Sequence, residues 1–178
     1  MDDTHALAKS LNAEYPGGDV GVLSVYFLNH VTLKPGEAIF MAPDTPHAYL
    51  SGDLIECMTC SDNVIRGGLT PKFKDIPVLL DSLSYIPTIP QPLTPVFSSG
   101  PCTTWRPTSE FGVTRLSLGL EGKAEWKSKT TGIAIVVEGS GRVGELKINR
   151  GQSVIIPAGD AVTISTDIGL EIYIADSS

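Results

Sequence analysis

Residues 33–43 read LKPGEAIFMAP, and residues 148–158 read INRGQSVIIPA. Each stretch combines a short strand-forming run, a glycine turn, a second strand-forming run and a proline that turns the chain again. This internal repeat predicts two copies of one β-module. When the two turn glycines are aligned, His47 falls on Val162, so a polar residue that is able to bind a ligand occurs in the first copy alone. We therefore expect the chemistry of the molecule to lie in the first copy.

Short runs of β-branched, aromatic and aliphatic residues continue this pattern in both directions. In the first half of the chain they predict strands at 22–28, 31–33, 38–41, 48–50 and 54–58. In the second half they predict strands at 112–120, 132–138, 143–148, 153–156, 162–165 and 170–175. The glycine-bearing stretch 138–144 is interpreted as a hairpin turn, because it lacks the pattern of a nucleotide-binding loop. Strands this short, separated by frequent turns, indicate a mainly β sandwich or barrel.

Two helices interrupt the β pattern. Residues 4–15 have helical spacing of apolar residues, and Pro16-Gly17-Gly18 ends the run. Asp75 is expected to cap a second short helix, and a proline-rich connector follows it over 87–95. The sequence therefore predicts an N-terminal helix, a partial barrel, a helix with connector and a complete C-terminal β domain, at 1–17, 18–69, 70–92 and 93–178.

Composition restricts the function classes. The 178 residues have a net charge of −7, which argues against nucleic-acid binding. No apolar stretch is long enough to cross a membrane, and the acidic start lacks the features of a secretory signal. Three cysteines form a sparse, odd set, so we expect a reducing, cytoplasmic location. Cys57 and Cys60 have metal or redox spacing, but no second pair accompanies them, and two cysteines packed inside a strand are the favoured interpretation.

Four residues in one window are candidates for chemistry. His47 follows a proline turn, where its imidazole is either directed into a barrel mouth or bonded at a strand end. Glu56 falls in an otherwise apolar predicted strand, where a carboxylate needs a partner or a water-filled cavity. Arg66 falls in a loop of small residues, and Lys72 opens the next helical region. Each charge alone is also compatible with a solvated position or a structural ion pair, so the residues themselves name no substrate.

Two stretches carry a family resemblance. Residues 33–58 read LKPGEAIFMAPDTPHAYLSGDLIECM, and residues 61–72 read SDNVIRGGLTPK. Both are similar to type I mannose-6-phosphate isomerase, and weaker similarity extends along the whole chain. That family is built from cupin-type β-barrels with a helical insertion, and it interconverts mannose 6-phosphate and fructose 6-phosphate. The resemblance implies a mainly β chain that contains a partial first cupin, a complete C-terminal cupin, and short N-terminal and connecting helices.

The resemblance also implies roles for individual residues. His47 matches a histidine that binds the catalytic zinc. Arg66, Glu56 and Lys72 match catalytic residues, and Tyr49, with Arg66 and Lys72, matches residues that bind the substrate. The implied reaction is aldose–ketose isomerisation through an enediol, in which an acid–base residue moves a proton between adjacent carbons. Zinc in the family stabilises the developing enediolate oxygen.

The sequence departs from the family in its metal ligands. The other ligands of the family come from a Gln-x-His pair and from a glutamate in a His-Lys-Pro-Glu run, and neither motif occurs in this sequence. Since a catalytic zinc normally has three protein ligands, we expect the chain alone to retain no zinc and to be weakly active or inactive. The alternatives are a non-catalytic, lectin-like sugar-binding cupin and an interaction module. The expected partners are a mannose-type sugar or sugar phosphate and either a second copy or a missing N-terminal half.

Overall fold

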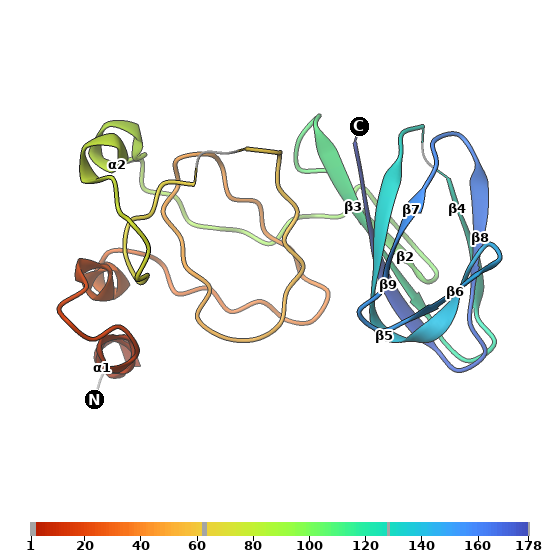
Figure 1. Ribbon diagram of the computed structural model, residues 1–178, viewed down its shortest axis with the longest axis horizontal. Coiled ribbons are helices and arrows are strands. Elements are labelled where there is room, and N and C mark those ends of the chain that lie inside the picture. Colours follow the sequence, from red (N-terminus) through yellow and green to blue (C-terminus); the bar gives the residue numbers. More distant parts are fainter. Residues whose placement is uncertain (1–2, 62–63, 128, 178) are drawn as a thin grey trace. The chain divides into compact units, whose positions relative to one another are not determined.

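The computed structural model describes residues 3–61, 64–127 and 129–177. The chain forms two compact units. The first contains the described residues up to Asp53 together with Cys60–Pro92, and the second contains Leu54–Thr59 together with the residues from Leu93 onward. Figure 1 shows helices and long loops in the first unit and β-strands in the second. No helix within the described ranges is long and apolar enough to cross a bilayer.

In the described residues of the first unit, the regular secondary structure consists of three short helices. They are α1 (Asp3–Glu14), the 3-10 helix η1 (Val20–Tyr26) and α2 (Ile76–Ser82). The helices predicted at the N-terminus and after Asp75 are therefore confirmed, and the Asp75 carboxylate accepts the Val78 amide at 3.2 Å as an N-cap. A small apolar cluster, made by Ala8, Leu11, Val22 and Val25, joins α1 to η1.

The strands predicted in the first half are wrong. Residues 20–26 form η1, because Asp19 caps its first turn and because a spacing of three places Val22 and Val25 together against α1. The other predicted runs, at 31–33, 38–41, 48–50 and 54–58, form no strand in the described chain (Figure 1). A strand exists only when its amides and carbonyls find a ladder partner, and β propensity alone does not supply one.

The described residues of the second unit contain nine strands, and the mainly β prediction is confirmed. Seven of them follow the hydrogen-bonded order β1-β2-β3-β9-β5-β8-β4, and β6 and β7 also pair with β5. Every pairing is antiparallel. The strands are β1 (Phe97–Ser99), β2 (Cys102–Trp105), β3 (Phe111–Leu118), β4 (Lys123–Lys127), β5 (Gly132–Val143), β6 (Leu146–Asn149), β7 (Ser153–Ile156), β8 (Ala161–Ser165) and β9 (Leu170–Ser177).

Alternation along the strands creates the core of the second unit. In β9, every second residue from Leu170 to Asp176 is buried, as the period of two in a strand requires. The same alternation in β3 places Leu116 and Leu118 on the buried face. The largest fully buried side chains of this core are Leu116, Val136, Ile156, Ile164, Ile172 and Ile174.

The predicted hairpin turn over 138–144 is wrong in its position. Strand β5 continues to Val143, and the turn lies at Gly144 and Glu145. A register shift between Val136 and Glu138 lets this long strand pair with β9 at one end and with β6 at the other. Glycine therefore permits the bend in β5, where Gly139 has a positive φ of 74°.

The internal repeat is reproduced in the local structure of both turns. The Glu37 amide donates to the Lys34 carbonyl at 3.0 Å, and a Glu37 carboxylate oxygen accepts the Lys34 amide at 2.8 Å. Gln152 and Asn149 make the same two bonds at 3.0 and 2.8 Å. The turn glycine has a φ of 83° in the first copy and 82° in the second. Positive φ at the third position of a turn favours glycine in both copies.

The correspondence extends to the next turn along the chain. Asp44 has a φ of 61°, and Gly159, at the equivalent position, has a φ of 84°. Aspartate is among the few residues with a side chain that tolerate this region. The Asp44 carbonyl also accepts the Ser84 amide at 2.8 Å, which ties the turn before His47 to the segment after α2. The first copy thus keeps the turns of the module without its strand ladder.

Candidate functional site

His47 is exposed, and its ring orientation is fixed by one bond. Its Nδ1 lies 2.9 Å from the Thr45 carbonyl oxygen. A carbonyl oxygen only accepts, so Nδ1 carries the proton in this contact, and the lone pair of the neutral ring lies on Nε2. Histidines that bind metals usually have this arrangement, in which one nitrogen donates to a backbone or carboxylate oxygen and the other faces the ion. His47 is therefore suited to supply one ligand.

Tyr49 lies beside His47. The two ring centroids are 5.8 Å apart, and the ring planes are tilted by 59°. This geometry is that of an edge-on aromatic contact, which stabilises the positions of both rings. About half of the Tyr49 surface is exposed (51%), so the ring is also accessible to a ligand. The structure thus brings together the predicted metal residue and one predicted substrate-binding residue.

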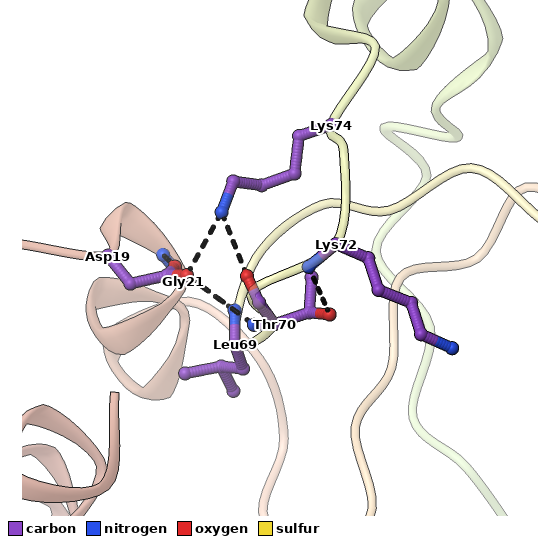
Figure 2. Close-up of polar contacts among 6 residues, drawn as sticks. All are labelled: Asp19, Gly21, Leu69, Thr70, Lys72 and Lys74. Carbon is purple, nitrogen blue, oxygen red and sulfur yellow. Dashed lines mark hydrogen bonds and ion pairs between the residues drawn. The ribbon is translucent and has the colours of Figure 1, made fainter. Parts of the chain in front are cut away.

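Arg66 and Lys72 lie on one loop that precedes α2. Arg66 is half-buried and Lys72 is exposed. The Lys72 amide donates to the Thr70 hydroxyl at 3.2 Å, so the backbone at Lys72 has a fixed direction. Figure 2 shows the Lys72 side chain extending away from the contacts that hold this loop. Its ammonium group is therefore presented outward from an anchored backbone.

Asp19 anchors this loop, and the sequence reasoning missed it. Its side chain is 9% exposed, and its carboxylate accepts amides of both Gly21 and Leu69, at 2.8 and 3.0 Å (Figure 2). It also forms an ion pair with Lys74 at 3.2 Å. Aspartate is a preferred N-cap residue directly before a helix, but interpreting residues 22–28 as a strand concealed this signal at Asp19.

Glu56 belongs to a different compact unit of the chain than the other candidate residues. Its segment, Leu54–Thr59, belongs to the second unit, whereas the remaining candidates belong to the first. The Thr59 hydroxyl donates to a Glu110 carboxylate oxygen at 2.9 Å, which ties the segment to the second unit. Glu56 is exposed, so the expectation of a carboxylate inside an apolar strand is wrong. A role for Glu56 stays a prediction.

The two spaced cysteines are not packed inside a strand, so that interpretation is also wrong. Cys57 is half-buried, Cys60 is exposed, and neither falls in a strand. Burial raises the pKa of the Cys57 thiol, and the negative charge of Asp176 raises it further. A raised pKa keeps the Cys57 thiol protonated and unreactive at neutral pH.

The described residues do not form a complete metal site. No group of three or more His, Cys, Asp or Glu side chains in them is arranged to hold an ion. His47 fits one position of a zinc site, but three protein ligands are normal for catalytic zinc. The donor set in the described ranges therefore does not fit a resident zinc, and no chemical step is assigned to one.

Comparison with known proteins identifies what the chain resembles. It is 41% identical, over 94% of its length, to the mannose-6-phosphate isomerase of Cryptococcus neoformans, and it is 57% identical over 82 residues to the human enzyme of that name. It also aligns over its full length with the crystal structure of mannose 6-phosphate isomerase from Salmonella typhimurium, at a TM-score of 0.79 and 30% identity. The chain is similar to the C-terminal portion of mannose-6-phosphate isomerase. No family model matches the chain.

The isomerase resemblance predicted from the sequence is confirmed, and so is the cupin-type, mainly β fold class. The chain spans 41% of the Cryptococcus enzyme and 46% of the Salmonella chain. The Salmonella structure contains fructose 6-phosphate and zinc, and a related solved isomerase structure is also zinc-bound. Fructose 6-phosphate and zinc are therefore ligands of the Salmonella protein, and zinc is a ligand in the second solved structure.

Proposed function

We propose that the chain provides one part of a mannose-6-phosphate isomerase site, which interconverts mannose 6-phosphate and fructose 6-phosphate. The observation that carries the proposal is the 41% identity to an isomerase over 94% of the chain. The segment that carries Arg66 and Lys72 gives it a physical basis, because two cations on an anchored loop are suited to a phosphate group. Relatives support the isomerase reaction as the activity to which this chain contributes.

Each candidate has a role in this proposal. Arg66 and Lys72 bind the phosphate and offset negative charge that develops on the sugar oxygens. Tyr49 supplies an aromatic surface and a hydroxyl for the sugar. Glu56 is the candidate acid–base group for moving a proton between the first and second carbons. His47 supplies one ligand to a zinc whose other ligands come from outside the described residues.

The proposal also covers the zinc content and the activity of the isolated chain. With one suitable histidine, the isolated chain retains no zinc and is weakly active or inactive. Apolar side chains of the first unit, among them Val31, Leu33, Phe40 and Leu50, are exposed. We infer that polypeptide equivalent to the rest of the relatives covers them, since exposed apolar patches mark interaction surfaces. Three free cysteines suit the cytoplasm as the location.

Calorimetric titration of the purified chain with fructose 6-phosphate tests the proposal. The Arg66→Met and Lys72→Met variants each weaken binding about tenfold or more, because each removes a charge-assisted contact to phosphate. Lys147→Met is the matched control, since Lys147 is an exposed cation of β6 in the second unit. Equal affinity for fructose and fructose 6-phosphate, or an equal effect of Lys147→Met, would contradict the proposal.

A further inference from the structure

A single carboxylate joins two segments that are far apart in the sequence. Oδ1 of Asp19 accepts the Gly21 amide at 2.8 Å and the Leu69 amide at 3.0 Å. Its Oδ2 is 3.5 Å from the Thr70 amide and 3.2 Å from the Lys74 ammonium group. Figure 2 shows these bonds converging on Asp19 from the start of η1 and from the loop before α2. With a side chain 9% exposed, Asp19 is available to few partners besides these.

The backbone segments at Gly21 and Gly68 are packed too closely to accept a side chain at either glycine. A methyl group added at Gly68 would lie 2.6 Å from the Gly21 Cα, and one added at Gly21 would lie 2.8 Å from the Leu69 amide nitrogen. The two glycines therefore permit the approach that lets Asp19 reach Leu69. Packing and hydrogen bonding thus act on the same pair of segments.

The loop itself has a backbone conformation that needs support. Leu69 has a φ of 51°, which is uncommon for a residue with a branched side chain. Such conformations persist where surrounding contacts hold them. The bond from the Leu69 amide to Asp19 is one such contact. Lys74 adds another, because its ammonium donates both to Asp19 and to the Thr70 carbonyl oxygen, at 3.2 and 3.1 Å.

We propose that Asp19 is a positioning residue that fixes the loop bearing Arg66 and Lys72 in the conformation that binds a sugar phosphate. The inference rests on the proposed function for the ligand and on the contacts above for the geometry. Asp19 does not touch the ligand in this proposal. It acts through the backbone at 68–70, whose direction determines where the two cations point. The family resemblance assigned roles to the cations but none to this carboxylate.

The charge of Asp19 is consistent with this role. Burial alone raises the pKa of its carboxyl group, but bonds from the Leu69 and Gly21 amides and from Lys74 outweigh this effect, and the pKa lies below its ordinary value. The carboxylate is therefore ionised at neutral pH, as an acceptor of several N–H groups must be.

Asp19→Ala tests the inference with two separate readouts. Hydrogen exchange of the Leu69 amide becomes about 10- to 100-fold faster, because a bond to a charged group is lost. The dissociation constant for fructose 6-phosphate rises about tenfold or more. Asp19→Asn, which keeps an acceptor oxygen for the amides, restores at least part of both properties. Gly68→Ala disturbs the same contact without changing charge and weakens binding in the same direction.

Asp75→Ala is the control, because Asp75 also caps a helix of the first unit through one side-chain bond. It leaves fructose 6-phosphate affinity and Leu69 exchange unchanged. An affinity loss as large in Asp75→Ala as in Asp19→Ala would overturn the inference, as would unchanged Leu69 exchange in Asp19→Ala. If the unaltered chain binds no fructose 6-phosphate, the proposed function fails, and Leu69 exchange still decides whether Asp19 holds the loop.

Discussion

The Arg106–Asp176 pair makes a sharp prediction about the second unit. One Arg106 guanidinium nitrogen lies 2.9 Å from both carboxylate oxygens of Asp176. The Asp176 side chain is 3% exposed and the Arg106 side chain 33%. The Arg106→Met variant removes the cation and leaves a buried carboxylate without that partner.

The expected loss of unfolding free energy in Arg106→Met depends on how deeply the two side chains are buried. Removing one member of a fully buried pair costs about 3–5 kcal/mol of unfolding free energy. Because a third of the Arg106 side chain is exposed, we expect a smaller loss for Arg106→Met, about 2–4 kcal/mol. The double variant Arg106→Met/Asp176→Leu removes both polar groups and returns to within about 1–2 kcal/mol of the unaltered chain, since apolar replacement of a buried pair is often nearly neutral.

Urea unfolding followed by tryptophan fluorescence measures these losses. The two tryptophans, Trp105 and Trp126, are 6% exposed and both belong to the second unit, so the signal reports on that unit. Arg150→Met is the control, because Arg150 is an exposed cation, and this variant changes the unfolding free energy by less than about 0.5 kcal/mol. A loss below about 1 kcal/mol in Arg106→Met, or a double variant less stable than the single one, would refute the reasoning.

Two further predictions concern the first unit and the repeat. The lowered pKa of Asp19 stabilises the folded chain at pH values above the ordinary carboxyl pKa of 3.8, and this stabilisation is lost as the pH falls through the folded-state pKa. Asp19→Asn has no carboxyl group at this position, so its stability lacks this dependence on pH when acid unfolding is followed by circular dichroism. An identical acid transition in both proteins would be inconsistent with it. Replacing Gly36 or Gly151 by alanine costs about 1 kcal/mol in each case, because both have positive φ. Calorimetry checks this, and full stability in either variant would argue against the turn assignment.

Strands were predicted correctly where the local residue pattern favours a strand and a pairing partner is available in the fold. The run of β-branched, aromatic and aliphatic residues at 170–175 predicted β9 correctly, because one face of that strand is buried in the core and its neighbours β3 and β5 lie in the same unit. β4 was missed because Lys123 and Lys127 leave a single buried side chain, Trp126, in a short charged strand. β1 and β2 were missed as well, being three and four residues long.

The first half shows the opposite case. Runs such as 38–41 have strong β propensity, but no ladder partner is found for them in the described chain. Propensity predicts where a strand is able to form, while pairing is a long-range property that the run itself does not encode. The roles of the candidate site residues stay predictions. Residue types in one window supplied His47, Arg66 and Lys72, and the family resemblance added Tyr49. The support from Asp19 was missed, because it depends on a contact across about fifty residues.

The most direct test of the central claim measures zinc content and coupled mannose-6-phosphate isomerase activity on the purified chain. We propose that the chain supplies one part of the site, with His47 as one ligand. The account predicts far less than one zinc per chain and no turnover above the enzyme-free rate, because one histidine does not hold a catalytic zinc. About one zinc per chain together with turnover would contradict the account, since it would mean that the chain completes the site by itself.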